Sequence, residues 1–137
     1  MGKFTKEQID SVRAKVKSGA DFPWVIQEFK SIGILNYEFM VSDGTCIYQG
    51  EDGFSLKEKS VSAKRDISNN PSIIELKHSL RIHQAGKTDF MAFCRQAAEA
   101  GVYRWMTDIQ KMEVVYYDTD GNKMLAEEIP QANRRSN

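Results

Sequence analysis

Apolar residues near the N-terminus follow the spacing of an amphipathic α-helix. Ile9, Val12 and Val16 recur at intervals of three and four residues, which places them on one face of a helix. Thr5 stands three residues before Gln8 and predicts a capping box at the start of this helix. The pattern therefore predicts a short helix whose apolar face packs against the rest of a domain.

A second helix is predicted to begin at Asp21, whose short carboxylate suits the N-cap position. Phe22, Ile26 and Phe29 lie along one face of this helix. Gly33 follows its last turn, where a glycine in the left-handed conformation commonly ends a helix. Residues 5–33 are therefore predicted to form two consecutive helices.

After Gly33 the apolar period changes to two. Tyr37, Phe39 and Val41 alternate with Glu38 and other positions of the opposite face, which is typical of a half-buried strand. Turn sequences at 42–44 and 52–53 divide the following residues into further strands. The predicted order of this part of the chain is helix, helix, strand, strand, strand.

The same order returns in the second half when the chain is aligned with itself at one constant offset, without a gap. Asp89 then takes the place of Asp21, and Gly101 takes the place of Gly33. Further pairs at this offset are Tyr37 with Trp105, Cys46 with Val114, Tyr48 with Tyr116, and Asp52-Gly53 with Asp120-Gly121. We therefore interpret the chain as a tandem duplication.

The predicted fold class is α+β, with one domain (residues 1–130) built from two repeats. The first repeat is residues 5–57 and the second is residues 71–130, which opens on a predicted Ser72–Glu75 capping box. A polar linker, residues 58–70, joins them, and residues 131–137 form a C-terminal tail. Because a unit of about 60 residues is marginal alone, we expect both repeats to share one core. This core would lie between an antiparallel sheet and the helices packed on one of its faces. A pseudo-twofold axis would relate the two repeats.

Composition and charge narrow the functions that need to be considered. Nineteen basic and 19 acidic residues cancel, and both halves of the chain are balanced, so neither nucleic acid nor an anionic membrane is expected as a partner. The chain has no export signal and no apolar run long enough to cross a membrane, so we expect a cytoplasmic protein. In that compartment Cys46 and Cys94 are expected to be free thiols. The sequence leaves open whether the protein forms a homodimer.

One ordered set of residues resembles a bacterial family, catalogued as domain of unknown function family 1398. The set is Asp89, Phe90, Phe93-Cys94-Arg95, Ala100-Gly101-Val102, Tyr116, Gly121, Glu128 and Pro130. The resemblance covers roughly residues 8 to 130, and Trp105 stands where the family is expected to carry a tyrosine. The resemblance implies a compact α+β domain. Some members of this family carry the label phage envelope protein. The resemblance implies no reaction, cofactor or catalytic residue.

The spacing of Asp118, Asp120 and Asn122 is that of the first ligands in a calcium loop. However, Lys123 stands where that loop needs a glycine, and Ile129 stands where it needs a bidentate glutamate. The flanking residues alternate as strands, whereas the calcium loop requires helices. We therefore predict a hairpin turn here, and no metal or cofactor site elsewhere in the sequence.

Cys94 and His83 are the candidates for catalysis. Cys94 lies about one turn into a predicted helix beside Arg95, where a thiolate could be stabilised. His83 replaces an apolar position of the repeat and could act as a base. The alternative, which we favour, is that Cys94 is a buried apolar filler and that His83 lies at a contact between helix and sheet.

Four aromatic residues occupy equivalent positions in the two repeats and are the candidates for ligand binding: Tyr37, Tyr48, Trp105 and Tyr116. Such residues can line a groove for a flat or apolar ligand. The alternative, which we favour, is that cross-strand aromatic pairs only stabilise the sheet. If a site exists, we expect it between the two repeats.

Three functions are therefore compared. The favoured one is a non-enzymatic binding or protein-interaction domain, because the sequence contains no catalytic set. The second is a small-molecule binder or small enzyme that uses an aromatic-lined groove between the repeats. The third is a phage-associated structural protein, which only the family label implies.

Overall fold

The computed structural model describes residues 3–59 and 64–131. The predicted linker and tail therefore lie partly outside the described residues, at 60–63 and 132–137. The helices of the first half are α1 (Lys6–Ala14), the 3-10 helix η1 (Gly19–Asp21), α2 (Phe22–Ser31) and the 3-10 helix η2 (Glu51–Gly53), and its strands are β1 (Asn36–Met40), β2 (Cys46–Gln49) and β3 (Ser55–Glu58). The second half contains α3 (Ile73–Gln84), α4 (Phe90–Glu99), β4 (Arg104–Asp108), β5 (Glu113–Tyr117) and β6 (Lys123–Glu128).

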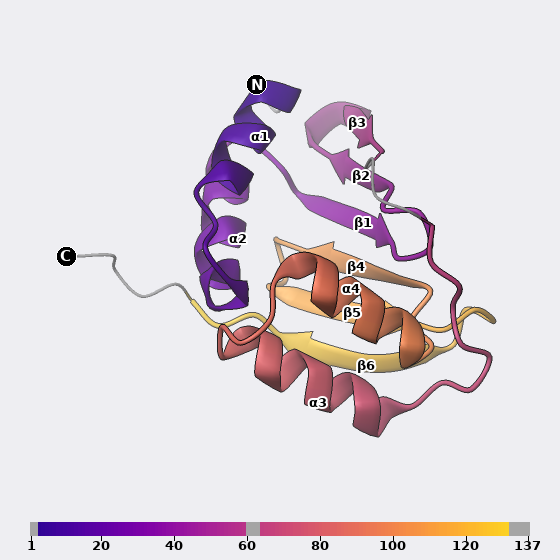
Figure 1. The fold of residues 1–137 in the computed structure, drawn as a ribbon. Coiled ribbons are helices and arrows are strands. Elements are labelled where there is room, and N and C mark those ends of the chain that lie inside the picture. Colours follow the sequence, from indigo (N-terminus) through magenta and orange to yellow (C-terminus); the bar gives the residue numbers. More distant parts are fainter. Residues whose placement is uncertain (1–2, 60–63, 132–137) are drawn as a thin grey trace.

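The strands form a six-stranded sheet in the order β3-β2-β1-β4-β5-β6, and each neighbouring pair is antiparallel (Figure 1). Each repeat contributes one half of this sheet, and β1 and β4 join the halves at the centre. The predicted α+β class and antiparallel sheet are confirmed.

The pairing of β1 with β4 is centred on equivalent residues of the two repeats. Glu38 is opposite Met106, which is its equivalent in the second repeat. On either side of this pair, Tyr37 is opposite Thr107 and Phe39 is opposite Trp105. A twofold axis through the Glu38–Met106 pair would produce this same register.

Both helix pairs pack on the same face of the sheet. Phe29 of α2 contacts Tyr37 and Tyr48, with ring centroids 5.7 and 5.8 Å apart. Phe93 of α4 contacts Trp105 at 5.5 Å. These strand residues are buried, whereas their neighbours along each strand are only half-buried or exposed, as alternation requires. Helices α3 and α4 lie over β4–β6, and α1 and α2 lie beside them over the other half (Figure 1). One core therefore serves both repeats.

Several helix ends follow the sequence prediction. Thr5 and Gln8 form the predicted capping box, and the Asp89 carboxylate accepts a hydrogen bond from the Ala92 N–H at 2.8 Å. Gly33 and Gly101 end α2 and α4 with φ of 104° and 90°, in the left-handed region where glycine avoids the steric cost of a side chain.

Three predicted details at helix ends are wrong. Asp21 makes no capping hydrogen bond to α2, and its carboxylate instead accepts from the Lys17 N–H at 2.8 Å. Helix α1 ends at Ala14, so Val16 lies beyond the helix and is 38% exposed. In the second repeat, Ser72 does accept from the Glu75 N–H, but only this half of the predicted capping box is present.

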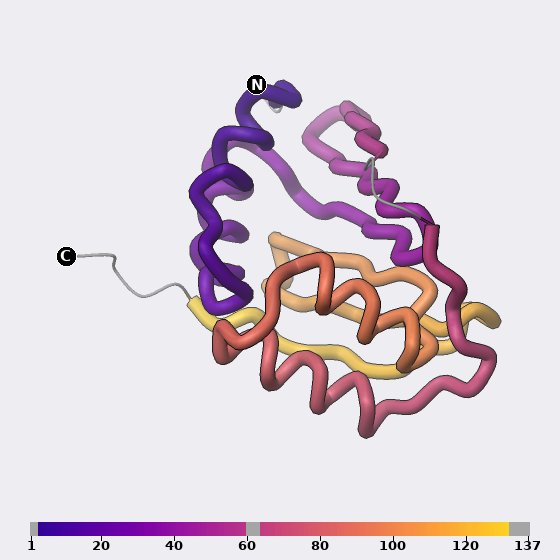
Figure 2. The backbone as a smooth tube through the Cα atoms, in the orientation of Figure 1, coloured from indigo at the N-terminus to yellow at the C-terminus, as the bar shows by residue number. Residues whose placement is uncertain are grey.

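The described part of the linker, which Figure 2 shows from residue 64 to α3, is hydrogen-bonded to both repeats. The Arg65 N–H donates to the carbonyl of Ser42 at 2.7 Å, and the Ser68 N–H donates to the carbonyl of Ala98 at 2.9 Å. The linker therefore adds contacts between the repeats as well as connecting them.

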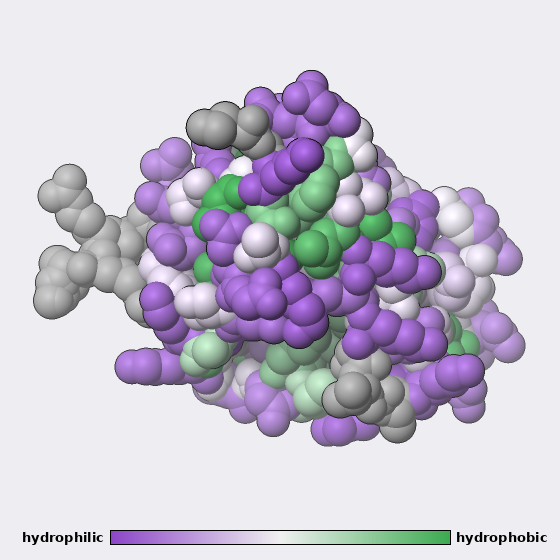
Figure 3. All heavy atoms as spheres, turned by 90° about the horizontal axis from the view of Figure 1, so that it is seen from above, coloured by the Kyte–Doolittle hydropathy of each residue, from purple (hydrophilic) through white to green (hydrophobic). Residues whose placement is uncertain are grey.

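The N-terminal segment covers part of the core near β3. Phe4, which precedes α1, is buried and packs edge-on against the half-buried Phe54, with ring centroids 4.9 Å apart. Viewed from above, hydrophobic and hydrophilic side chains are interspersed on this end of the molecule (Figure 3).

Candidate functional site

A cavity of about 390 Å³ lies between the two helix pairs, on the covered face of the sheet. Aromatic rings from both repeats line it. The first repeat contributes Phe22, Phe29, Tyr37 and Phe39, and the second contributes Phe90, Phe93, Trp105 and Tyr116. Val16 and Phe90 at its rim are 38% and 42% exposed, so the cavity opens to solvent. We call it the inter-repeat cavity.

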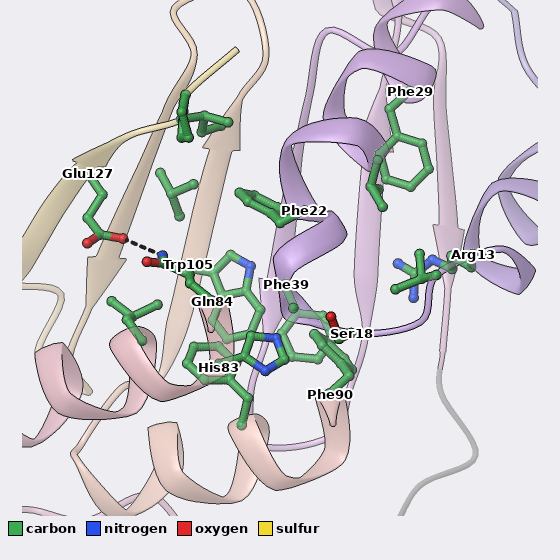
Figure 4. A pocket seen from close by; sticks show the side chains of 18 of the residues that line it. Arg13, Ser18, Phe22, Phe29, Phe39, His83, Gln84, Phe90, Trp105 and Glu127 are labelled. Carbon is green, nitrogen blue, oxygen red and sulfur yellow. Dashed lines mark hydrogen bonds between the residues drawn. The ribbon is translucent and has the colours of Figure 1, made fainter. Parts of the chain in front are cut away.

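Local sequence features place these rings. Strand alternation directs Phe39 and Trp105, which are opposite each other in β1 and β4, toward the helices. Their rings stack with centroids 4.6 Å apart and an interplanar angle of 25°. The Asp89 cap begins α4 so that Phe90 and Phe93 fall on the face turned toward Trp105. The result is a stack of two rings at the centre, with further rings around it (Figure 4).

Of the four aromatic residues predicted from the repeat, three line the cavity: Tyr37, Trp105 and Tyr116. Tyr48 does not line it, but packs behind Tyr37 with ring centroids 5.5 Å apart. Burial raises the pKa of Tyr37 to about 12 and raises that of Tyr116 as well. The hydroxyls of these tyrosines therefore stay protonated near neutral pH. That this group binds a ligand stays a prediction.

Cys94 is fully buried in α4 and does not line the cavity. Burial raises the pKa of its thiol to about 12. Cys46 is also buried, and burial raises its thiol pKa to about 11. Both cysteines are free thiols, as expected. A protonated, enclosed thiol gives little support to the hypothesis that Cys94 is a nucleophile.

His83 lines the cavity, at the end of α3, and its ring stacks on Phe93 at 4.7 Å with an interplanar angle of 15°. Its Nδ1 lies 3.1 Å from both the carbonyl oxygen and the side-chain oxygen of Thr88. Burial lowers the pKa of His83, so the neutral imidazole is favoured. The hydrogen bonds of His83 therefore go to Thr88, and none joins it to Cys94 within the described chain.

Replacing His83 with asparagine is expected to reduce the loss of stability on acidification. The folded-state pKa of His83 lies below its ordinary value of 6.5, so the unfolded chain binds a proton first as the pH falls. The neutral His83 therefore favours folding fully above pH 6.5, and this contribution decreases as the pH falls toward the folded-state pKa. Urea unfolding between about pH 7 and pH 5 measures the effect.

The exposed His78, on the same helix, provides the matched control. His78→Asn measures the cost of an asparagine at an exposed position of α3, which is subtracted from the cost of His83→Asn. If His83→Asn keeps the wild-type dependence of the unfolding free energy on pH, the assignment of a lowered pKa to His83 is wrong.

Arg13 was not singled out from the sequence but reaches the cavity from the last turn of α1. Its Nη2 donates a hydrogen bond to the Tyr48 hydroxyl and lies 3.9 Å from the Cys46 sulfur. The opposite rim of the cavity carries Glu127, whose Oε1 accepts from Gln84 Nε2 at 3.3 Å. Lys17, Asp89 and Glu128 also line the cavity, so charged groups of both signs lie in its wall.

Gly19 is a second residue that the sequence did not mark as part of the site. It is buried in η1, lines the cavity and lies directly against His83. A side chain at this position would overlap the backbone carbonyl of His83. Gly19 therefore marks a close approach between the first repeat and α3 of the second.

The segment that resembled a calcium loop is a hairpin turn, as predicted. The Asp118 carboxylate accepts hydrogen bonds from the N–H groups of Asp120 and Asn122, both at 2.9 Å. Gly121 has φ of 82°, as a tight turn requires. In residues 3–59 and 64–131, no group of three or more His, Cys, Asp or Glu side chains could hold a metal ion.

None of the helices in the described ranges has the length and apolar composition needed to cross a bilayer. A family model described as a protein of unknown function, DUF1398, matches residues 10–128. The chain is also 27% identical over 117 residues to the uncharacterised protein YcgX of Escherichia coli strain K12, which covers 84% of this chain and 86% of that relative. The family match agrees with the resemblance seen in the sequence. The chain belongs to the DUF1398 family of proteins of unknown function.

Proposed function

We propose that the protein is a non-enzymatic binding module, and that it holds a small, flat, apolar ligand in the inter-repeat cavity. The observation that carries this proposal is the cavity of about 390 Å³ with aromatic rings from both repeats in its wall. Pockets for small organic ligands commonly have volumes of about 300 to 1,000 Å³ and mostly apolar walls. The stacked rings of Phe39 and Trp105 offer a planar surface for such a ligand.

Three observations support binding rather than catalysis. The Cys94 thiol is enclosed, and burial keeps it protonated. The Nδ1 of His83 faces Thr88, and burial favours the neutral ring. The cavity tyrosines also keep their protons, so the polar groups in the wall are suited to fix a ligand rather than to transfer protons.

The apolar fluorophore N-phenyl-1-naphthylamine is expected to bind with 1:1 stoichiometry and a micromolar Kd, on the order of 1 to 10 μM. Its emission rises when it leaves water for an apolar site, so a fluorescence titration measures the binding. Phe90→Ala removes one ring from the wall and should weaken binding about fivefold, since an aromatic contact contributes roughly 1 kcal/mol.

Phe54→Ala is the matched control, because Phe54 is also a half-buried aromatic but does not line the cavity. It should leave the Kd unchanged. Emission that rises without saturation, or a Kd that Phe90→Ala does not change, would show that the fluorophore binds elsewhere and would contradict the proposal.

A further inference from the structure

We infer that the ligand of the inter-repeat cavity is a flat aromatic acid, whose anionic group is held by the guanidinium of Arg13. The inference rests on the proposed function, since it names the chemical class of ligand for that same cavity. The observations that carry it are the hydrogen-bonding capacity that Arg13 keeps at the cavity wall and the positions of Arg13 and Glu127 at opposite sides of the cavity.

The charge of Arg13 has no carboxylate partner in residues 3–59 and 64–131. The ion pairs there are Lys6 with Asp10, Lys6 with Glu58, and Arg104 with Glu38. The partners of Arg13 are the Tyr48 hydroxyl and the Cys46 sulfur, and both are contacted by Nη2. Burial raises the pKa of both groups, so both stay uncharged near neutral pH.

A guanidinium carries five N–H donors in a planar fork that matches the two oxygens of a carboxylate. In Arg13 one nitrogen makes the contacts with Tyr48 and Cys46, which fixes the side chain at the cavity wall. The remaining donors are available to a ligand. A carboxylate at this place would supply the counter-charge that the surrounding residues lack.

The positions of Arg13 and Glu127 favour one orientation of the ligand. Figure 4 shows Arg13 and Glu127 at opposite sides, with His83, Phe39 and Trp105 between them. Glu127 would repel an anionic group at its own rim, whereas Arg13 would attract it. The aromatic part of an acid bound to Arg13 would then lie toward the stacked rings of Phe39 and Trp105.

The second repeat shows that this charge arrangement is specific to one rim. Tyr116 is the equivalent of Tyr48 in that repeat. The charged group that acts on Tyr116 is the carboxylate of Glu127, not an arginine. Arg81, which is the equivalent of Arg13, does not line the cavity.

The test compares two compounds of nearly the same shape, 2-naphthoate and the neutral 2-naphthamide. Each is used to displace bound N-phenyl-1-naphthylamine at neutral pH. On the wild-type protein, the acid should displace it at about tenfold lower concentration, as one charge-assisted contact allows. Arg13→Met should remove this preference, while Arg81→Met should keep it.

Equal displacement by acid and amide, no displacement by either, or a preference that survives in Arg13→Met would each overturn the inference and leave apolar binding intact. Failure of N-phenyl-1-naphthylamine itself to bind would instead overturn the proposed function. If Arg13→Met does not fold, the Nε–Hε resonance of Arg13 in the ¹⁵N-labelled wild type provides the readout. It should shift with 2-naphthoate at about tenfold lower concentration than with 2-naphthamide, and the absence of a shift with 2-naphthoate would overturn the inference.

Discussion

Phe39→Ala is expected to lower the free energy of unfolding by about 4 kcal/mol, since removing a buried phenylalanine side chain costs about 3 to 5 kcal/mol. Phe39 is 4% exposed and stacks on Trp105 across the seam between the repeats. It also meets Phe90 of α4, with ring centroids 5.4 Å apart. One substitution in the first repeat therefore removes packing contacts from both repeats. Thermal unfolding should show a decrease in Tm of roughly 15 °C.

Phe90→Ala is the matched control for this loss. Phe90 contacts the rings of Phe39 and Trp105 but is 42% exposed, so its removal should cost only about 1 kcal/mol. Both variants should unfold in a single transition, because the repeats share one core. Two separate transitions, with only one of them shifted by Phe39→Ala, would show that each repeat folds on its own core.

The features that could be predicted from the sequence are those that depend on a few neighbouring residues. The Thr5–Gln8 capping box, the Asp89 cap and the glycine ends of α2 and α4 each involve contacts within a few residues. Strand alternation is equally local, and it correctly placed the buried face of each central strand.

The predictions that were wrong concern places where a neighbouring segment competes for the same group. Asp21 has the residue type of an N-cap, but η1 precedes α2 directly and puts Asp21 in a helical conformation with φ of −84° and ψ of 0°. Its carboxylate then turns back to the Lys17 N–H. Val16 is a different case, since it continues the apolar spacing of α1 but lies beyond the end of the helix.

The cavity itself could only partly be predicted. Periodicity identifies which face of a strand is buried, and it brought Tyr37, Trp105 and Tyr116 to one side of the sheet. The space between the two helix pairs depends on how each pair lies on the sheet, which is a property of the whole fold. Arg13 and Gly19 were missed for this reason, because their partners belong to other elements, far away in the chain.

The two halves of the chain carry different charged groups at the candidate site. A duplicated domain with identical units would present the same groups at both rims of a cavity on its axis. In this chain Arg13 approaches Tyr48 in the first repeat, whereas Glu127 lies near Tyr116 in the second. The proposed orientation of an acidic ligand depends on this difference.

Gly19→Ala is expected to lower the free energy of unfolding by about 3 kcal/mol, at the upper end of the range of about 1 to 3 kcal/mol typical of overpacking. The added Cβ would overlap the carbonyl oxygen of His83 and would lie 2.5 Å from its Cδ2. A backbone carbonyl cannot rotate away as a flexible side chain can, so η1 and α3 must move apart. Both elements form the wall of the inter-repeat cavity, and thermal unfolding should show a decrease in Tm of roughly 10 °C.

Gly121→Ala is the control that separates this steric effect from backbone conformation. Gly121 has φ of 82° but nothing within 4 Å of the added Cβ, so its substitution should cost about 1 kcal/mol through the left-handed conformation alone. Gly19 is not among the glycines with positive φ, so without the contact an alanine there would stabilise the fold by restricting the unfolded chain. Backbone conformation alone would therefore make Gly121→Ala the more destabilising change. The contact with His83 should make Gly19→Ala the more destabilising of the two. A Gly19→Ala variant as stable as the wild type would mean that η1 and α3 do not approach each other as closely as described. The described position of this part of the cavity wall would then be wrong.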